Sequence, residues 1–349
     1  MRSVFRGWPM ATVVIVATAL GGLGSAATAA AGEQVLNLYT SRHYQSDEAL
    51  YAGFAKATGI KIKRIEGKGD VLIERIKSEG ANSPADVLIT ADAGRLWRAE
   101  QAGLLRPLRS AVLETRIPAR LRHPDGMWFG FSQRARLIFY DKARFKAGEI
   151  ETYEDLANPK WRGEVCIRSS SNIYNLSLLG SMIAADGEAA AEAWAKGVVA
   201  NFARSPQGGD TDQIRAVAAG ECGIAVANSY YYARLLRSSK DSDRAAAQAV
   251  GVVFPNQKGR GTHVNISGGG ILKAAPHPDI AARFLEYLAS DEAQRIFSNG
   301  NNEYPVVATV APNATLVALG KFKADTLNVA NLGKNQPLAQ RIFDRAGWQ

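Results

Sequence analysis

In the first half of the chain, short apolar runs typical of strands alternate with segments whose apolar residues have helical spacing. Short runs dominated by apolar residues, such as Val35–Thr40, predict strands. Between them, apolar residues recur at helical spacing, as in the segment that Ser46 caps, that carries Leu50 and Phe54 on one face, and that Gly59 stops. Strands that alternate with helices predict a parallel α/β sheet. The expected strands are 35–40, 60–65 and 85–90, and the expected helices are 46–58, 70–78 and 92–102.

The second half contains two extended segments that bracket another α/β block. The first, Trp128–Tyr140, is longer than the usual strand of about five or six residues. We therefore expect two lobes with a ligand cleft between them, in which residues 32–133 and 262–349 form lobe 1 and the inserted residues 134–261 form lobe 2. Further expected elements are strands 165–168 and 223–228, extended stretches 251–254 and 262–267, and helices 175–185, 189–201, 211–219, 279–289 and 291–298.

The first 31 residues have the pattern of a secretory signal peptide. Arg2 and Arg6 precede the apolar stretch Met10–Leu23, and small residues follow up to Ala31. The apolar stretch is shorter than the roughly 20 residues that a membrane anchor needs. We expect cleavage near Ala31 and an exported, soluble mature protein.

Length and charge set limits on the class of protein. The chain has 349 residues, and its formal net charge of +9 falls to +7 when Arg2 and Arg6 leave with the signal peptide. At about 100 to 200 residues per domain, this length predicts two domains. The Lys and Arg residues are spread along the chain rather than gathered in a stripe, so we expect no nucleic-acid partner.

The two cysteines are expected to form a structural disulfide. Cys166 and Cys222 both lie in short apolar runs that predict strands, and an exported protein folds in an oxidising compartment. No histidine is close to either cysteine in the sequence, which argues against a catalytic thiol. The chain also lacks the common hydrolase, zinc-protease and phosphate-loop motifs, and Gly268–Gly270 is expected to be a turn rather than a dinucleotide site. We do not expect an enzyme.

Tyrosines follow the ends of three predicted strands. Five of the eleven tyrosines and His43 lie in the segments Ser41–Tyr44, Ser169–Tyr174 and Ser229–Arg234. Phenolate is a hard anionic oxygen ligand that suits Fe³⁺, whereas zinc and copper(I) prefer His and Cys. Calcium or magnesium would need carboxylates, which are scarce in these segments. Taken alone, the Tyr230–Tyr232 run more often reflects aromatic packing, a His-Tyr pair is more often structural or stacks on a ligand, and Ser169–Ser171 could simply cap a helix.

Six separated motifs together resemble one known family. The chain is similar over nearly all of its mature length to the periplasmic ferric-iron-binding proteins of bacterial ABC importers, which have the two-lobed periplasmic-binding-protein fold (type II). The motifs are Leu38–Tyr44, Ala85–Thr90, Asn158–Gly163, Asn228–Tyr231, His263–Gly268 and Asn301–Pro305.

The resemblance assigns roles to individual residues. It implies that Tyr44, Tyr174, Tyr230 and Tyr231 bind Fe³⁺ through their phenolates, while Tyr232 packs. His43 matches a histidine that some family members use as a further ligand and others leave displaced. Arg134 and Arg234 match cations near the metal. The early acidic ligand of some members is absent, and the resemblance leaves open whether an anion such as carbonate takes part.

The resemblance also implies partners: a membrane permease and its ATPase receive iron from a protein expected to be a monomer. The rival interpretation is a protein of the same fold that captures an anion or a small organic solute. In that case Arg134, Arg234 and the Ser169–Ser171 loop would bind the solute, and the tyrosines would only stack.

Overall fold

The computed structural model describes residues 1, 4, 7–10, 34–42 and 44–349. Residues Met1–Gly32 and Glu33–Gln349 form separate units. Most of the predicted signal peptide, its cleavage site and His43 lie outside the described residues. Among the described residues, no helix is long and apolar enough to cross a membrane.

The strands form a mixed sheet with the order β2-β1-β3-β9-β5-β7-β6. β1 pairs with β2 and with β3 in parallel, as predicted, whereas β9 runs antiparallel to β3. The strands are β1 (Val35–Thr40), β2 (Lys61–Glu66), β3 (Val87–Ala91), β4 (Leu105–Arg106), β5 (Phe129–Asp141), β6 (Val165–Cys166), β7 (Ile224–Asn228), β8 (Val250–Val253), β9 (Val264–Leu272) and β10 (Tyr304–Pro305).

Helices cover the sheet, and most match the predicted ranges within a few residues. The helices are α1 (Asp47–Thr58), α2 (Gly69–Glu79), α3 (Ala93–Gln101), α4 (Ala111–Arg116), α5 (Ile173–Ala200), α6 (Asp210–Ala218), α7 (Ser229–Leu236), α8 (Asp241–Ala249), α9 (Pro278–Leu288), α10 (Asp291–Asn301), α11 (Ala314–Ala318), α12 (Ala330–Lys334) and α13 (Gln336–Ala346). Gly59 ends α1 with a left-handed φ of 73°. Ser46, by contrast, makes no side-chain cap. Gly187 interrupts α5 with a φ of 84°, where two helices were predicted.

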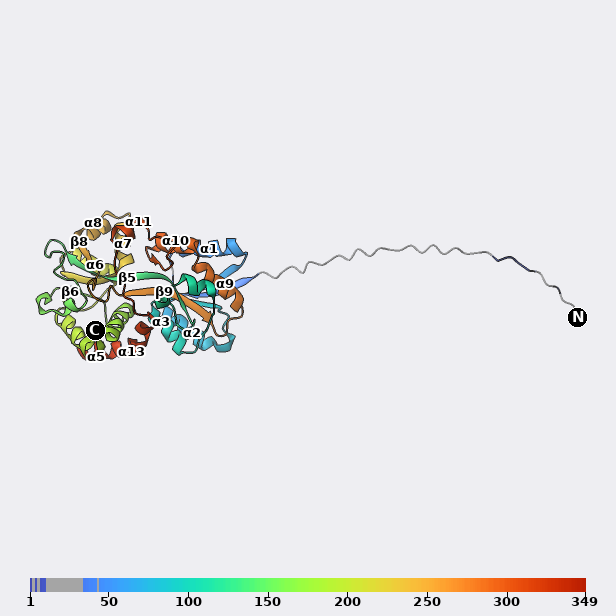
Figure 1. Ribbon diagram of the computed structural model, residues 1–349, viewed down its shortest axis with the longest axis horizontal. Helices are drawn as coiled ribbons and strands as arrows, with labels where there is room; N and C mark the ends of the chain where they lie inside the picture. Colours follow the sequence, from blue (N-terminus) through green and yellow to red (C-terminus); the bar gives the residue numbers. More distant parts are fainter. Residues whose placement is uncertain (2–3, 5–6, 11–33, 43) are drawn as a thin grey trace. The chain divides into compact units, whose positions relative to one another are not determined.

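β5 joins the two lobes. Its first half, Phe129–Ala135, pairs with β9, and its second half, Arg136–Asp141, pairs with β7 and β8. Figure 1 shows β5 and β9 side by side at the centre, with α1, α2 and α3 on one side and α5, α6 and α8 on the other. The long extended segment of the sequence is therefore one strand shared by two sheets.

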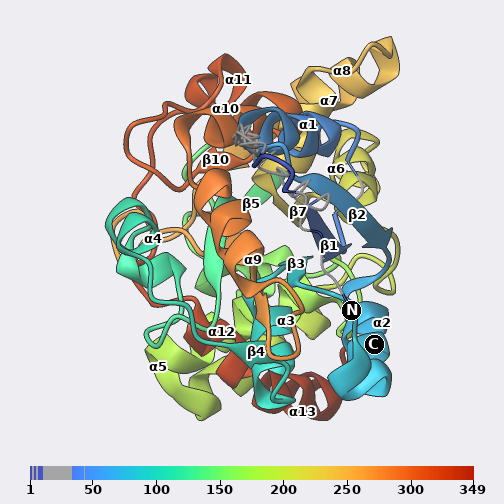
Figure 2. The same cartoon turned by 90° about the vertical axis from the view of Figure 1, so that its right-hand side faces the viewer.

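Each lobe has its own apolar core. In the first lobe, Phe284 and Leu285 of α9 belong to the same buried cluster as Leu36 and Leu38 of β1, and Figure 2 shows α9 in the foreground. In the second lobe, successive residues of β5 face opposite sides of the sheet: Ile138 and Tyr140 enter one core cluster, and Ala135, Leu137 and Phe139 enter another. This alternation explains why residues 137–140 of β5 are all apolar, whereas polar residues interrupt its first half.

The C-terminal helix packs with the second lobe, which differs from the expectation that residues 262–349 belong to lobe 1. Ile342 and Phe343 of α13, together with Trp348, are buried in the same cluster as Ile138 and Ile224. The sequence pattern shows that α13 has an apolar face, but it cannot show which lobe covers that face. Because residues 33–349 form one compact unit, the lobe boundaries near residues 133 and 262 stay predictions.

The three consecutive glycines lie inside β9, so the expectation of a turn was wrong. A Cβ atom at Gly268 would lie 2.4 Å from the carbonyl oxygen of Phe129, and one at Gly270 would lie 2.3 Å from that of Met127. Glycine is required here because neighbouring backbone comes too close for any side chain.

Candidate metal centre

Four tyrosines from both lobes meet near the ends of their strands. Tyr44 follows β1, Tyr174 lies in the first turn of α5, and Tyr230 and Tyr231 lie in the first turn of α7, directly after β7. The hydroxyl oxygens of Tyr174 and Tyr230 are 3.3 Å apart. Two oxygens that each lie about 2 Å from one ion can be no more than about 4 Å apart, so this pair can bind a single metal ion.

Arg234 lies among tyrosines of both lobes. Its guanidinium carbon is 5.5 Å from the ring centroid of Tyr44, 5.7 Å from that of Tyr230 and 5.6 Å from that of Tyr231. The rings of Tyr230 and Tyr231 are themselves 4.2 Å apart at an interplanar angle of 31°. The ligand-bearing segments that are far apart in the sequence therefore converge on one place.

A second group of guanidiniums surrounds Tyr174. Arg134, Arg136 and Arg168 place their guanidinium carbons 5.8, 5.7 and 5.6 Å from its ring centroid. Arg134 is 1% exposed, and its Nε and Nη2 have no hydrogen-bond partner among the described residues. Buried donors normally have acceptors. The two unpaired donors fit a site that receives an anionic oxygen, such as a phenolate or a bound anion.

Burial favours the protonated form of three of these tyrosines in the absence of a metal. It raises the pKa of Tyr44, and the charge of Glu303 adds to the effect while Arg42 opposes it. Burial also raises the pKa of Tyr230 well above its usual value, reinforced by Tyr174, Tyr44 and Tyr231. The pKa of Tyr231 is raised for the same main reason. These phenols need a strong cation to become phenolates at neutral pH.

A chain of buried ion pairs lies next to Tyr44, beginning with Arg42, whose guanidinium carbon is 5.0 Å from the ring centroid of Tyr44. Arg42 donates to both carboxylate oxygens of Asp47, at 3.0 and 2.9 Å, and to Glu303 at 2.9 Å. Glu303 also accepts from Ser267 at 3.1 Å and lies 3.7 Å from Arg134. Burial alone would raise the pKa of Glu303, but Arg42 and Arg134 outweigh burial and lower it. Glu303 therefore stays ionised beneath the tyrosines.

Asp210 is the buried carboxylate that pairs with arginines beside the tyrosines of the other lobe. It is completely buried at the start of α6 and accepts from Arg136 at 2.7 Å and from the backbone N–H of Asn228 at 2.7 Å. Arg168 lies 3.3 Å from its second oxygen. With the buried carboxylate of Asp92, which also acts on Arg134, one positive charge remains around the tyrosines. Five guanidiniums and three further carboxylates contribute to it. They are Arg42, Arg134, Arg136, Arg168 and Arg234, and Asp47, Asp210 and Glu303.

The structure brings together six of the residues that the sequence singled out and leaves Tyr232 apart. The six are Tyr44, Tyr174, Tyr230, Tyr231, Arg134 and Arg234. The hydroxyl of Tyr232 donates to the carbonyl of Ala247 at 3.1 Å, and its ring packs 5.2 Å from that of Phe139. No cluster of three His, Cys, Asp or Glu residues occurs in the part of the chain that the structure describes. Tyrosine oxygens are thus the main candidate ligands.

The supporting charges escaped the sequence analysis. Arg42 stands next to the predicted site and Glu303 lies in one of the six motifs, which were the only signals available. Nothing in the sequence showed that these side chains are buried. Beside the tyrosines, a surface hollow of about 550 Å³ is lined in part by Tyr231, Arg234 and Arg237, so solvent reaches the edge of the site.

The chain is similar to several known proteins. The family described as "Bacterial extracellular solute-binding protein" matches residues 49–324. Iron uptake protein A1 of Synechocystis is 55% identical over 317 residues, which cover 91% of this chain and 88% of that protein. The major ferric iron-binding protein of Neisseria meningitidis is 30% identical, with 89% and 92% of the two chains covered.

A solved structure is also similar. The Trichodesmium protein IdiA (FutA), described as being in complex with iron and citrate ligands, has a TM-score of 0.88 and 60% sequence identity. The match covers 90% of this chain and all of the Trichodesmium chain.

Proposed function

Because the chain belongs to the family of bacterial extracellular solute-binding proteins, we propose that it is the periplasmic ferric-iron-binding component of an ABC importer. It binds Fe³⁺ in the cleft between its lobes and delivers the ion to a membrane permease driven by an ATPase. The observation that carries the proposal is the meeting of Tyr44, Tyr174, Tyr230 and Tyr231. No reaction on an organic substrate is part of it.

Charge explains why this site suits a trivalent ion. Four phenolates on Fe³⁺ give a complex with one negative charge, and the surrounding guanidiniums and carboxylates, Asp92 included, leave one positive charge. The positive surroundings favour both the loss of phenol protons and the resulting anionic complex. The unpaired donors of Arg134 supply hydrogen bonds that strengthen when the phenols ionise.

The relatives support iron as the ligand. Their names describe iron uptake in Synechocystis and ferric iron binding in Neisseria, and the Trichodesmium structure contains iron and citrate. We propose that Arg134 and Arg234 hold a carbonate or carboxylate anion when one accompanies the metal. The role of His43 is decided by the ferric affinity of His43→Ala. A loss of affinity assigns His43 as a ligand, and an unchanged affinity leaves the four phenolates.

Iron binding is expected to close the cleft. Ligands from both lobes join at one ion, so the metal stabilises the closed arrangement and shifts the population toward it. The permease then recognises this closed shape. Two arginines already connect α7 to the end of α10. Arg234 of α7 donates to Asn301 at 3.1 Å, and Arg237, directly after α7, donates to Asn302 at 2.7 Å. The mature protein is proposed to act as a monomer.

A second candidate is a protein that binds an anion or a small organic solute. The buried, unpaired donors of Arg134 favour it, since they fit a carboxylate as well as a phenolate. The two candidates differ in what stays bound. Protein mixed with ferric citrate and then desalted should retain one iron per chain under the first proposal. Under the second it would retain no iron but would bind iron-free citrate.

A further inference from the structure

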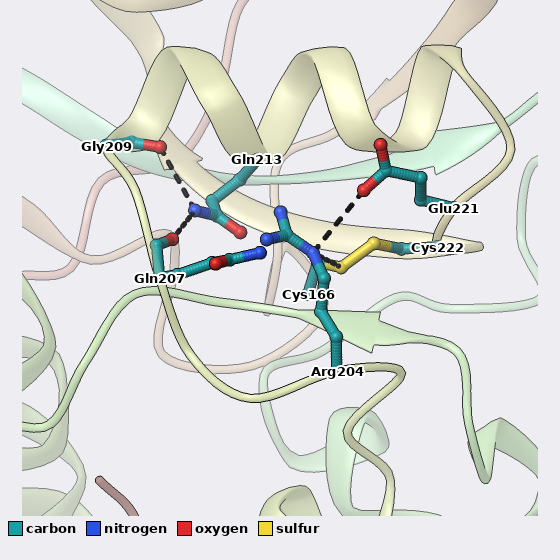
Figure 3. The surroundings of a disulfide bond; sticks show 7 residues. All are labelled: Cys166, Arg204, Gln207, Gly209, Gln213, Glu221 and Cys222. Atoms are coloured by element: carbon teal, nitrogen blue, oxygen red, sulfur yellow. Dashed lines mark hydrogen bonds and ion pairs between the residues drawn. A yellow bond between two sulfur atoms is a disulfide. The ribbon is translucent and has the colours of Figure 1, made fainter.

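The disulfide of the second lobe links the two chain segments that carry neighbouring phenols. Cys166 ends β6, and Cys222 lies just before β7. Their Cα atoms are 5.8 Å apart, and Figure 3 shows the bond between the two strands. The expectation of a disulfide from the sequence is confirmed.

The bond lies at equal distances along the chain from both phenols. Tyr174 is eight residues beyond Cys166, and Tyr230 is eight residues beyond Cys222. The two cysteines are therefore 56 residues apart in the sequence, and so are the two tyrosines. Because β6 and β7 run parallel, the two segments leave the disulfide in the same direction and meet again where the hydroxyl oxygens are 3.3 Å apart.

The segment that leads to Tyr174 has little other support from the sheet. β6 pairs with β7 at only two residues, Val165 and Cys166. β7, by contrast, pairs with β5 at five consecutive residues, 224–228, and continues directly into α7. Tyr230 is therefore held by the sheet. Tyr174 is held by the packing of α5, by the bond from Arg136 of β5 to Asn175 at 2.9 Å, and by whatever fixes β6 to β7.

Further links between these segments are polar and lie nearer the phenols. Buried Arg136 donates to Asn228 at 3.3 Å and to Asn175 at 2.9 Å. Asp210 accepts from the backbone N–H of Asn228 and lies 3.3 Å from the guanidinium of Arg168. Arg168 is 22% exposed in its side chain, and its bond to Asp210 is long. The length of this ion pair can vary, so it limits the separation of the segments less strictly than a covalent bond does.

Resting on the ferric-binding function proposed above, we propose that the Cys166–Cys222 disulfide is a positioning element of the metal site. It fixes the position of the Tyr174 segment along β7 relative to the Tyr230 segment, so that both phenolates reach one ion. Full ferric affinity therefore requires the oxidised protein. Loss of the bond lets the β6 end shift along β7 and withdraws Tyr174 from the ion.

The surroundings of the bond indicate a permanent tie. Cys166 and Cys222 are 1% and 0% exposed. Arg204 covers them, since its Nε donates to the sulfur of Cys166 at 3.3 Å and lies 3.6 Å from Glu221 (Figure 3). Gln213 holds the loop beside Arg204 through the carbonyls of Gln207 and Gly209. A reductant cannot reach the sulfurs without local opening.

A double-mutant cycle tests the proposal. Ferric affinity is measured by competition with citrate for the wild type, for Cys166→Ala/Cys222→Ala, for Tyr174→Phe and for the combined variant. Removing the disulfide should weaken ferric binding at least about tenfold, the lower end for outer-shell support. In the Tyr174→Phe background it should weaken binding less than about threefold, because that phenolate is already absent. Tyr232→Phe is the matched control background and should retain the full loss.

The outcomes separate this inference from the proposed function. An equal loss in the Tyr174→Phe background, or no loss in either, overturns the positioning role, even if the melting temperature falls. If the oxidised wild type binds no iron, the proposed function itself fails.

If the cysteine-free chain does not fold, iron-loaded wild-type protein is treated with a phosphine reductant in mild urea. The tyrosinate-to-iron colour should then fade at the rate at which thiols appear. Colour that outlasts thiol formation, or that fades before it, overturns the proposal.

Discussion

The hydroxyl of Ser177 donates a hydrogen bond of 2.7 Å to the carboxylate of Asp92, which joins α5 of the second lobe to the residue after β3 of the first. Asp92 is completely buried and has a φ of 83°, an arrangement that costs a non-glycine residue about 1–3 kcal/mol. Its carboxylate also accepts from the backbone of Gly94 and from Asn265. These donors hold a strained residue at the point where the lobes meet.

Replacement of Ser177 by alanine should lower the free energy of unfolding by about 1–2 kcal/mol, because Asp92 loses a donor in a buried position. Thermal unfolding measures the change. Ser181→Ala is the control, since the Ser181 hydroxyl is also buried in α5 but bonds to Leu178 of the same helix. Equal destabilisation by both substitutions would contradict a special role for the bond to Asp92.

Replacement of Glu303 by glutamine should have two opposite effects. The free energy of unfolding should fall by about 3–5 kcal/mol, because Arg42 and Arg134 lose the charge between them. Iron, however, should be retained to a lower pH, since the charge of Glu303 raises the pKa of Tyr44 and its removal makes the phenolate easier to form. Urea unfolding and the pH of half-release measure the two effects.

The control for Glu303 is Glu292→Gln, which changes an exposed glutamate in the first turn of α10. It should alter neither quantity. Release of iron from Glu303→Gln at a higher pH than from the wild type would show that the carboxylate acts mainly by holding Arg42 and Arg134 in place.

Iron binding should release protons. Burial raises the pKa of Tyr44, Tyr230 and Tyr231, so these groups are protonated at neutral pH without metal and must lose their protons to bind it. At least about three protons should leave for each iron, and ferric affinity should fall as pH falls. Titration in weak buffer, corrected for the chelator, counts the protons. A release near zero fits solute stacking and contradicts phenolate binding.

Replacement of Arg134 by glutamine should weaken ferric binding by about 10- to 100-fold, because the iron complex loses a buried cation that faces the phenols. Ferric affinity by citrate competition measures the loss. Arg144→Gln, at an exposed arginine paired with Glu164, should leave affinity unchanged. An unchanged affinity in Arg134→Gln would mean that its unpaired donors serve another group.

Most of the fold could be read from local patterns. The period of two in Val35–Thr40, the helix stopped by Gly59 and the break near Gly187 all depend on neighbouring residues, which the sequence displays directly. The errors concern contacts between distant segments. Glycine is required at 268–270 because the backbones of β3, of β5 and of the segment before β5 lie too close for a side chain. The apolar face of α13 is covered by α5. No local pattern carries that information.

The candidate site divides in the same way. Tyrosines at strand ends could be found because carboxyl ends of strands gather at one edge of a sheet. The buried charges could not, since Arg42, Asp210 and Glu303 look like ordinary surface residues until their partners, 5 to 261 residues away, are known. Only the structure shows that buried guanidiniums give the tyrosines positively charged surroundings.

The central claim, that tyrosine phenolates bind ferric iron here, is tested most directly by visible absorption. Wild-type protein mixed with ferric citrate should develop a tyrosinate-to-iron charge-transfer band. The band should be lost or strongly weakened in Tyr230→Phe/Tyr231→Phe, and it should be unchanged in Tyr232→Phe, whose hydroxyl bonds to Ala247 instead. Absence of the band in the wild type, or its survival unchanged in the double variant, would contradict the account.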